Sequence, residues 1–166
     1  MRRIMLAVLA IAAFSPLTAR AQTVAQQAPG PEHQRLGIWV GEWTYEVGTS
    51  SGTVEGELVG DGFFLQWRET NTSEAGVTVH ILHVFGYDTV EQNYTWHRYF
   101  INGNIQFAKG WVSDANWTFL FDEQDGVRAR LTATMESSEV MTFAWAQSVK
   151  GGPWEVTNQG TMTKVR

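Results

Sequence analysis

The sequence contains no cysteine and only 4 prolines among its 166 residues. Without cysteine the chain can form no disulfide and can carry no acyl anchor on a lipobox cysteine. It also lacks a phosphate-binding glycine loop, a G-x-S-x-G motif, heptads and internal repeats. The folded protein must therefore be held together by its core, and nucleophilic catalysis has no recognisable motif.

Long hydrophobic runs are also missing. The apolar stretch at residues 4–14 is too short to cross a hydrocarbon core of about 30 Å. Two arginines precede it, and Ala19-Arg20-Ala21 follows it with the small-x-small pattern that signal peptidase recognises. We therefore expect a signal peptide at residues 1–21 and a disordered leader at residues 22–30. The mature protein is then periplasmic or secreted and has no integral membrane segment.

Positive charge is scarce. The chain has 12 Lys and Arg against 17 Asp and Glu, which gives a formal net charge of −5. Three of these arginines lie in the predicted signal peptide, so 9 cations face 17 acids in the mature chain, a formal charge of −8. This charge argues against nucleic acid as a partner, although a local cationic pocket remains possible. The remaining length suits one domain, predicted at residues 31–166.

Aromatic residues and glycines, in contrast, are abundant, with 8 Trp, 9 Phe and 16 Gly. This composition suits twisted strands joined by tight turns. Before the first strand, Pro31 and Glu32 mark the start of a short helix of about two turns. We expect Leu36 and Trp39 to pack this helix against the body of the protein.

From residue 42 onward the hydrophobic pattern has period two, with turn residues every 8 to 12 positions, which is typical of an all-β fold. The predicted strands cover residues 42–47, 53–58, 63–70, 77–87, 91–101, 104–112, 116–121, 127–135, 140–147 and 154–163. Short connections favour an antiparallel up-and-down meander, and a meander of ten strands removes its edges by closing into a β-barrel. A Greek-key sandwich would need longer connections.

The Asn102-Gly103 pair predicts a two-residue type I′ turn between two of these strands. The resulting register pairs Arg98 with Phe107 and Trp96 with Lys109. One face of the hairpin then carries Tyr94, Trp96, Arg98, Phe100, Ile105, Phe107, Lys109 and Trp111. Because most of these residues are apolar or aromatic, we expect this face to point into the barrel and to take both cations with it.

A turn through residues 114–115 conflicts with this register. It sets Trp117 opposite Val112 rather than opposite Trp111, unless a β-bulge intervenes. The sequence leaves the conflict open.

Buried cations need an anion, an aromatic ring face or water. Two kinds of interpretation stay open. In the structural one, Glu69 neutralises Arg98, or Lys109 lies near the rim and reaches solvent; in the other, the cations meet the anionic head of a bound ligand. In the second case the partner is a small hydrophobic or amphipathic molecule inside the barrel. The predicted ligand-binding residues are Trp67, Glu69, Tyr94, Trp96, Arg98, Phe107, Lys109 and Trp111.

Two further functions remain as alternatives. His80 and His83 lie on opposite faces of a strand, so they cannot share a metal, and no metal or cofactor is predicted. Either one could face inward. If His83 does, Glu69 with His83 or Tyr94 could supply the acid and base of an isomerase, cyclase or hydrolase. The third candidate is an envelope interaction module, in which a solid barrel binds a partner through its outer face.

Four segments carry a family resemblance: "EHQRLGIWVGEWTYEV", "GDGFFLQWRE", "HVFGYDTVEQNYTWHRY" and "SVKGGPWEVTNQGTMTK". They resemble the DUF1579 family of bacterial proteins over residues 32–164. The resemblance implies a calycin-like, or lipocalin-like, β-barrel with a short helix near one opening, and it supplies no activity. Nitrobindin-like barrels, a related shape, bind haem through a His near the end of the chain. Residues 154–166 contain no His, so haem is not expected.

Overall fold

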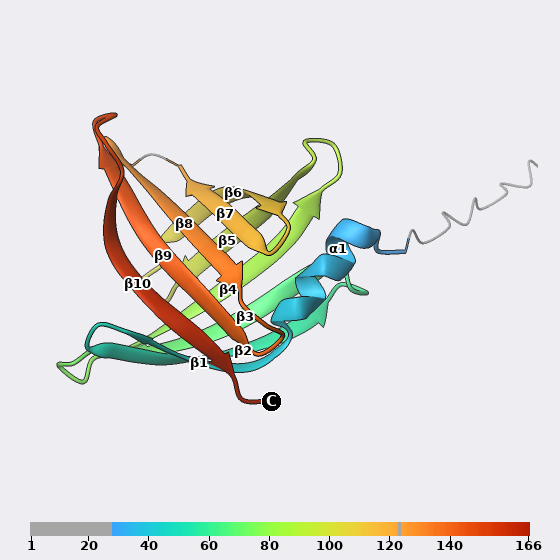
Figure 1. Cartoon of the computed structure of the whole chain (residues 1–166), viewed down its shortest axis with the longest axis horizontal. Coiled ribbons are helices and arrows are strands. Elements are labelled where there is room, and N and C mark those ends of the chain that lie inside the picture. The colour runs from blue at the N-terminus through green and yellow to red at the C-terminus, as the bar shows by residue number, and fades with distance from the viewer. Residues whose placement is uncertain (1–27, 123) are drawn as a thin grey trace, which may run out of the picture.

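The protein is a closed, ten-stranded antiparallel β-barrel with one short helical segment, as seen in a computed structural model (Figure 1). The structure describes residues 28–122 and 124–166. The predicted signal peptide and most of the predicted leader lie outside these residues. None of the helices in the described part of the chain has the length and apolar character needed to span a membrane.

The helical segment consists of α1 (Pro31–Arg35) and the 3-10 helix η1 (Leu36–Trp39). The strands are β1 (Gly41–Val47), β2 (Ser50–Val59), β3 (Phe64–Thr72), β4 (Thr78–Asp88), β5 (Asn93–Phe100), β6 (Ile105–Ser113), β7 (Asn116–Phe121), β8 (Val127–Met135), β9 (Val140–Val149) and β10 (Glu155–Lys164). Each strand pairs with its neighbours in sequence, and β1 also pairs with β10 to close the barrel. The predicted up-and-down barrel is confirmed, with strand bounds that differ from those predicted by three residues at most.

The helical segment closes one end of the barrel, and Figure 1 shows it lying against that end. Pro31 occupies the first turn of α1, where its missing N–H costs no hydrogen bond. Leu36 and Trp39 are buried as predicted. The Trp39 ring packs against Trp67 and Trp117, with ring centroids 5.4 and 4.4 Å away. We call this end, covered by residues 36–39, the closed end.

The turn between β5 and β6 differs from the prediction. The Gly103 N–H donates to the Phe100 carbonyl over 2.9 Å, and the Phe100 N–H donates to the Asn104 carbonyl over 3.0 Å. Residues 101–103 therefore form a three-residue loop, in which Gly103 has a φ of 82°. This is the common combination of a type I turn and a left-handed residue. The side chain of Asn102 accepts the Asn104 N–H.

The extra loop residue shifts the pairing by one position, so that Arg98 lies opposite Gln106. A shift of one residue turns every side chain of a strand to the other face. The prediction that Lys109 and Trp111 face the interior is therefore wrong. Lys109 forms an ion pair with Glu91 on the outside, and Trp111 is 48% exposed.

The same shift changes the rest of β6. Phe107 borders the mouth of the interior cavity, but its ring packs beside His97 on the outer side, with the ring centroids 4.8 Å apart. Val112 points inward and pairs with Trp117. The conflict between the two predicted turns disappears without a bulge, because the turn at residues 114–115 had the correct register.

Candidate functional site

The barrel encloses a cavity of about 890 Å³, which falls within the size range of small-molecule sites. The cavity extends from Trp39 at the closed end to Gln124 and Asp125 at the opposite end. Five of the predicted ligand-binding residues border it: Trp67, Glu69, Trp96, Arg98 and Phe107.

Tyr94 was predicted in the same set but lies in the core at the closed end. Its hydroxyl donates to the Glu32 carbonyl over 3.1 Å. Its ring packs against Trp117 and Tyr87, with centroid distances of 4.7 and 5.1 Å. The prediction that Tyr94 shares a site with Glu69 and Arg98 is therefore wrong, and Tyr94 closes the barrel instead.

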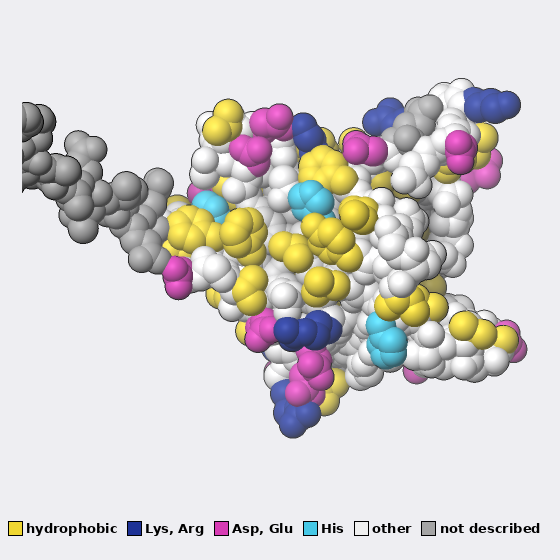
Figure 2. All heavy atoms as spheres, turned by 180° about the vertical axis from the view of Figure 1, so that it is seen from behind, with side chains coloured by type: hydrophobic (Ala, Val, Ile, Leu, Met, Phe, Trp, Pro, Cys, Tyr) yellow, Lys and Arg dark blue, Asp and Glu magenta, His cyan; other side chains and the backbone are white. Residues whose placement is uncertain are grey.

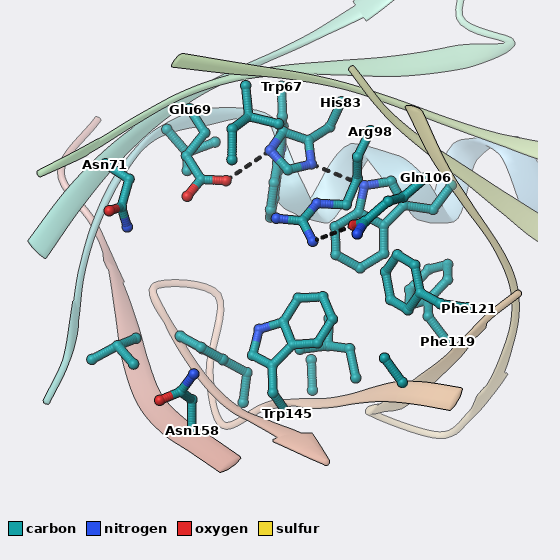
Figure 3. Close-up of a pocket in the computed structure, with 18 of the residues that line it drawn as sticks. Trp67, Glu69, Asn71, His83, Arg98, Gln106, Phe119, Phe121, Trp145 and Asn158 are labelled. Carbon is teal, nitrogen blue, oxygen red and sulfur yellow. Dashed lines mark hydrogen bonds and ion pairs between the residues drawn. The ribbon is translucent and has the colours of Figure 1, made fainter. Parts of the chain in front are cut away.

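A chain of hydrogen bonds ends on the carboxylate of Glu69. His83 Nε2 lies 2.7 Å from Glu69 Oε2, and the Tyr45 hydroxyl donates to Oε1. Asn71 donates to the Tyr45 hydroxyl over 2.5 Å, and the Trp96 indole N–H donates to His83 Nδ1 over 3.0 Å. The residues come from β1 and from the three adjacent strands β3, β4 and β5. Figure 3 shows the contact of His83 with Glu69 on one wall of the cavity.

The pairing of β3 with β4 decides which histidine faces inward. His83 lies opposite Trp67 and is 2% exposed, so it belongs to the interior. His80 lies on the outer face, where its ring contacts the Thr70 hydroxyl at 3.2 Å. The sequence does not determine which histidine faces inward, because the loop between β3 and β4 does not fix the register of these strands.

The partners of His83 determine its protonation. An indole N–H can only donate, so Nδ1 must accept from Trp96, and the ring proton must lie on Nε2, facing Glu69. Burial lowers the pKa of His83 below its ordinary value, and the neighbouring charge of Arg98 acts in the same direction, whereas Glu69 opposes both. His83 is therefore neutral, and both of its ring nitrogens are engaged.

Glu69 carries the negative charge in this chain of hydrogen bonds. Burial alone would raise its pKa, but the hydrogen bonds from His83 and Tyr45 and the nearby charge of Arg98 outweigh burial and lower it. Burial and the neighbouring Glu69 raise the pKa of Tyr45, which remains a hydrogen-bond donor. Glu69 is thus an ionised carboxylate, and its side chain is still 14% exposed.

Arg98 carries the positive charge. Its Nη1 donates to Gln106 Oε1 over 3.1 Å, while its Nε is buried without a hydrogen-bond partner. The guanidinium lies over the rings of Phe100 and Trp145, with Cζ 5.0 and 5.1 Å from their centroids. Burial lowers the pKa of Arg98 and Glu69 counteracts this, but a guanidinium stays charged in proteins.

Glu69 and Arg98 do not form an ion pair. Throughout residues 28–122 and 124–166, no carboxylate oxygen lies within 4.0 Å of a guanidinium nitrogen of Arg98. The interpretation in which Glu69 directly neutralises Arg98 is therefore wrong. Figure 3 shows the guanidinium pointing into the cavity, with Trp145 on the facing wall.

Sequence reasoning missed several polar residues of the cavity. Tyr45 and Asn71 were within reach of a period-two count on their strands, but no motif marks them. Gln106 was hidden by the one-residue error in the hairpin. Asn158 follows an irregularity in the pairing of β10 with β9, and such a β-bulge redirects side chains. Within the described chain, no group of three or more His, Cys, Asp or Glu side chains is arranged to hold a metal ion.

The chain matches no protein-family model and no curated protein. Among solved structures it is similar to the crystal structure of Rv2717c from M. tuberculosis, with a TM-score of 0.59 and 13% sequence identity. The similarity covers 82% of this chain and 99% of that one. Similarity at this level of identity supports the barrel fold and carries no function. The resemblance to the DUF1579 family stays a prediction.

Proposed function

We propose that this barrel binds a small amphipathic molecule, with the anionic head of the ligand at Arg98 and its apolar body along the aromatic wall. The observation that carries the proposal is the unpaired Arg98 guanidinium, which faces a cavity of about 890 Å³. A guanidinium has five N–H donors, and here one of them has a protein acceptor. A buried cation with free donors is costly unless an anion or water meets it.

The aromatic rings around Arg98 satisfy it only in part. Cation–π contacts offset some of the cost of burial, but they supply no acceptor for the N–H donors, which lie in the plane of the guanidinium. A carboxylate or phosphate oxygen would accept two of these donors side by side. The rings of Trp96, Phe121 and Trp145 supply apolar surface next to the Arg98 guanidinium. The site thus combines a charged anchor with an apolar wall.

Acid–base catalysis is less well supported. The pair of Glu69 and His83 exists as predicted, with a separation of 2.7 Å. However, His83 could take a proton from a substrate only after losing the hydrogen bond from Trp96. The second predicted acid, Tyr94, lies in the closed end. Ligand binding is therefore the better explanation of the site, because it does not require the hydrogen bond between Trp96 and His83 to break.

The interaction-module alternative assumed a solid barrel, and the cavity argues against it. Apolar side chains do gather on the outer face over β3 to β6, as Figure 2 shows from behind. Phe64, Leu82, Tyr99 and Trp111 are exposed there. Exposed apolar residues of this kind are common on folded proteins and do not identify a partner.

The test is a titration followed by tryptophan fluorescence, with decanoate as the probe. Arg98→Gln should weaken binding about tenfold or more, because the charged anchor is lost. Lys109→Gln is the matched control and should leave the affinity unchanged, because Lys109 pairs with Glu91 on the outside. Equal affinities of the wild type and Arg98→Gln would contradict the proposal, as would the absence of any response.

We also propose that the chain is exported and that cleavage follows Ala21. The sequence pattern of residues 1–21 supports this. Mass spectrometry of the protein from the periplasm or the medium should give a chain that begins at Gln22. A full-length chain confined to the cytoplasm would contradict export.

A further inference from the structure

Glu69 and Arg98 carry opposite charges at the cavity, and each has its own set of partners. Glu69 is held by Tyr45 and His83, while Arg98 is held by Gln106 and the rings around it. The two groups lie on the same wall in Figure 3, and they form no ion pair with each other. His83 contacts Glu69 and lies opposite Arg98 in the pairing of β4 with β5, and each charged group acts on the pKa of the other. They are therefore neighbours, but their hydrogen-bonding capacities remain available to a third group.

The hydrogen bonds around Glu69 all run toward its carboxylate. Asn71 donates to Tyr45, Tyr45 donates to Glu69, Trp96 donates to His83, and His83 donates to Glu69. An ionised carboxylate has about four acceptor sites, and two are used here. The Glu69 side chain is 14% exposed and borders the cavity, so a donor on a ligand can reach it there.

A ligand whose only polar group is a carboxylate would bind Arg98 but would offer no donor to Glu69. Its oxygens would meet the guanidinium of Arg98, but their charge would also lie near the charge of Glu69 and be repelled. A hydroxyl or ammonium group next to the carboxylate would donate to Glu69 and remove part of that repulsion. Buried acceptors without donors discriminate strongly against ligands that lack the matching donor.

We propose that the ligand is a hydroxy- or amino-substituted amphipathic carboxylic acid, whose carboxylate binds Arg98 and whose neighbouring donor binds Glu69. This inference rests on the function proposed above and names the chemical class of its ligand. Glu69 is then a specificity-determining residue and not a catalytic one. Its partners Tyr45 and His83 position the carboxylate and keep it ionised.

The test compares three probes on the wild-type protein: decanoate, 3-hydroxydecanoate and 3-methoxydecanoate. The methoxy compound keeps the extra oxygen but has no proton to donate. The dissociation constant of 3-hydroxydecanoate should be lower than those of the other two by about tenfold. Glu69→Gln should reduce this preference to about twofold or less, since it removes the negative charge that strengthens the hydrogen bond from the hydroxyl group.

Glu57→Gln is the matched control, because Glu57 pairs with Arg68 on the outer face of the barrel. It should keep the preference for 3-hydroxydecanoate. If Glu69→Gln does not fold, the dissociation constants of the three probes on the wild-type protein still test the inference. Equal binding of all three would overturn the inference and leave the proposed function intact. If none of the three binds, the proposed function fails together with it.

Discussion

At the scale of single residues, the contact between Trp96 and His83 determines how the cavity responds to pH. The Trp96 N–H occupies Nδ1, so a second proton on His83 would place two donors against each other. The folded-state pKa of His83 therefore lies below the ordinary value of 6.5. As the pH falls below 6.5, the unfolded chain takes up a proton that the folded chain refuses, and folding stability decreases.

His83→Gln should remove this part of the pH dependence. Glutamine can still donate to Glu69 and accept from Trp96, and it does not titrate. In the wild type, His83 contributes a slope of up to about 1.4 kcal/mol per pH unit below pH 6.5. Urea unfolding between pH 7.5 and pH 5 measures the difference. His80→Gln, on the outer face, should keep the wild-type slope. An unchanged slope in His83→Gln would contradict the prediction, because it would show that His83 takes up protons equally in the folded and the unfolded chain.

At the scale of elements, the hairpin of β5 and β6 decides which side chains line the cavity. Its strands and the location of its turn followed from the alternation and from Asn102-Gly103. The register did not, because Asn-Gly occurs both in two-residue turns and in three-residue loops with the glycine in the left-handed region. Gly103 alone takes a positive φ in this loop, all of which the structure describes. A single extra residue moved Lys109 and Trp111 from the inside to the outside.

Gly110→Ala tests this register. Gly110 lies on the inner face opposite Phe119, and a Cβ there would overlap the Phe119 ring. The substitution should destabilise the protein by about 1–3 kcal/mol, as overpacking of a core does. Chemical denaturation measures the loss. Lys109→Ala, one residue earlier, should have little effect. A neutral Gly110→Ala together with a strongly destabilising Lys109→Ala would restore the register predicted from the sequence.

At the scale of the whole molecule, the barrel is closed at one end by Trp39 and hollow toward the other. The Trp39 carbonyl accepts the indole N–H groups of Trp43 and Trp67 over 3.2 and 3.1 Å, and its ring contacts Phe85 and Phe119. The helical segment is thus tied to several strands at once. The closed end gives the cavity a floor, and the site containing Arg98 lies above it.

Trp39→Ala should therefore destabilise the whole barrel by about 3–5 kcal/mol, which is typical of removing a buried aromatic side chain. Trp39 is 3% exposed, whereas Trp111 is 48% exposed and serves as the control. Trp111→Ala should cost much less. Thermal or urea unfolding followed by circular dichroism compares the two. Similar losses for both variants would mean that Trp39 does not anchor the closed end.

The candidate site was predictable in part. Glu69 and Trp67 were assigned to one face of their strand from alternation, and Trp96 to the inner face of the hairpin from its apolar neighbours. The structure places all three at the cavity. Arg98 was also placed inside, although with the wrong partners across the hairpin. The mismatch at Trp117 was the signal in the sequence that the register of this hairpin was wrong, because the next turn required Val112 to face inward.

The sequence by itself determined the ten strands, the short helix and the closed antiparallel barrel, because period-two alternation and short turns are local properties of the chain. Only the tertiary structure decided which partner each strand residue faces. Register depends on contacts between strands. Turns of two and three residues are both common, but a turn that is longer by one residue exchanges the inner and outer faces of the strand that follows it. That choice placed His83 between Glu69 and Trp96 and left the half-buried Arg98 facing the cavity without an ion-pair partner.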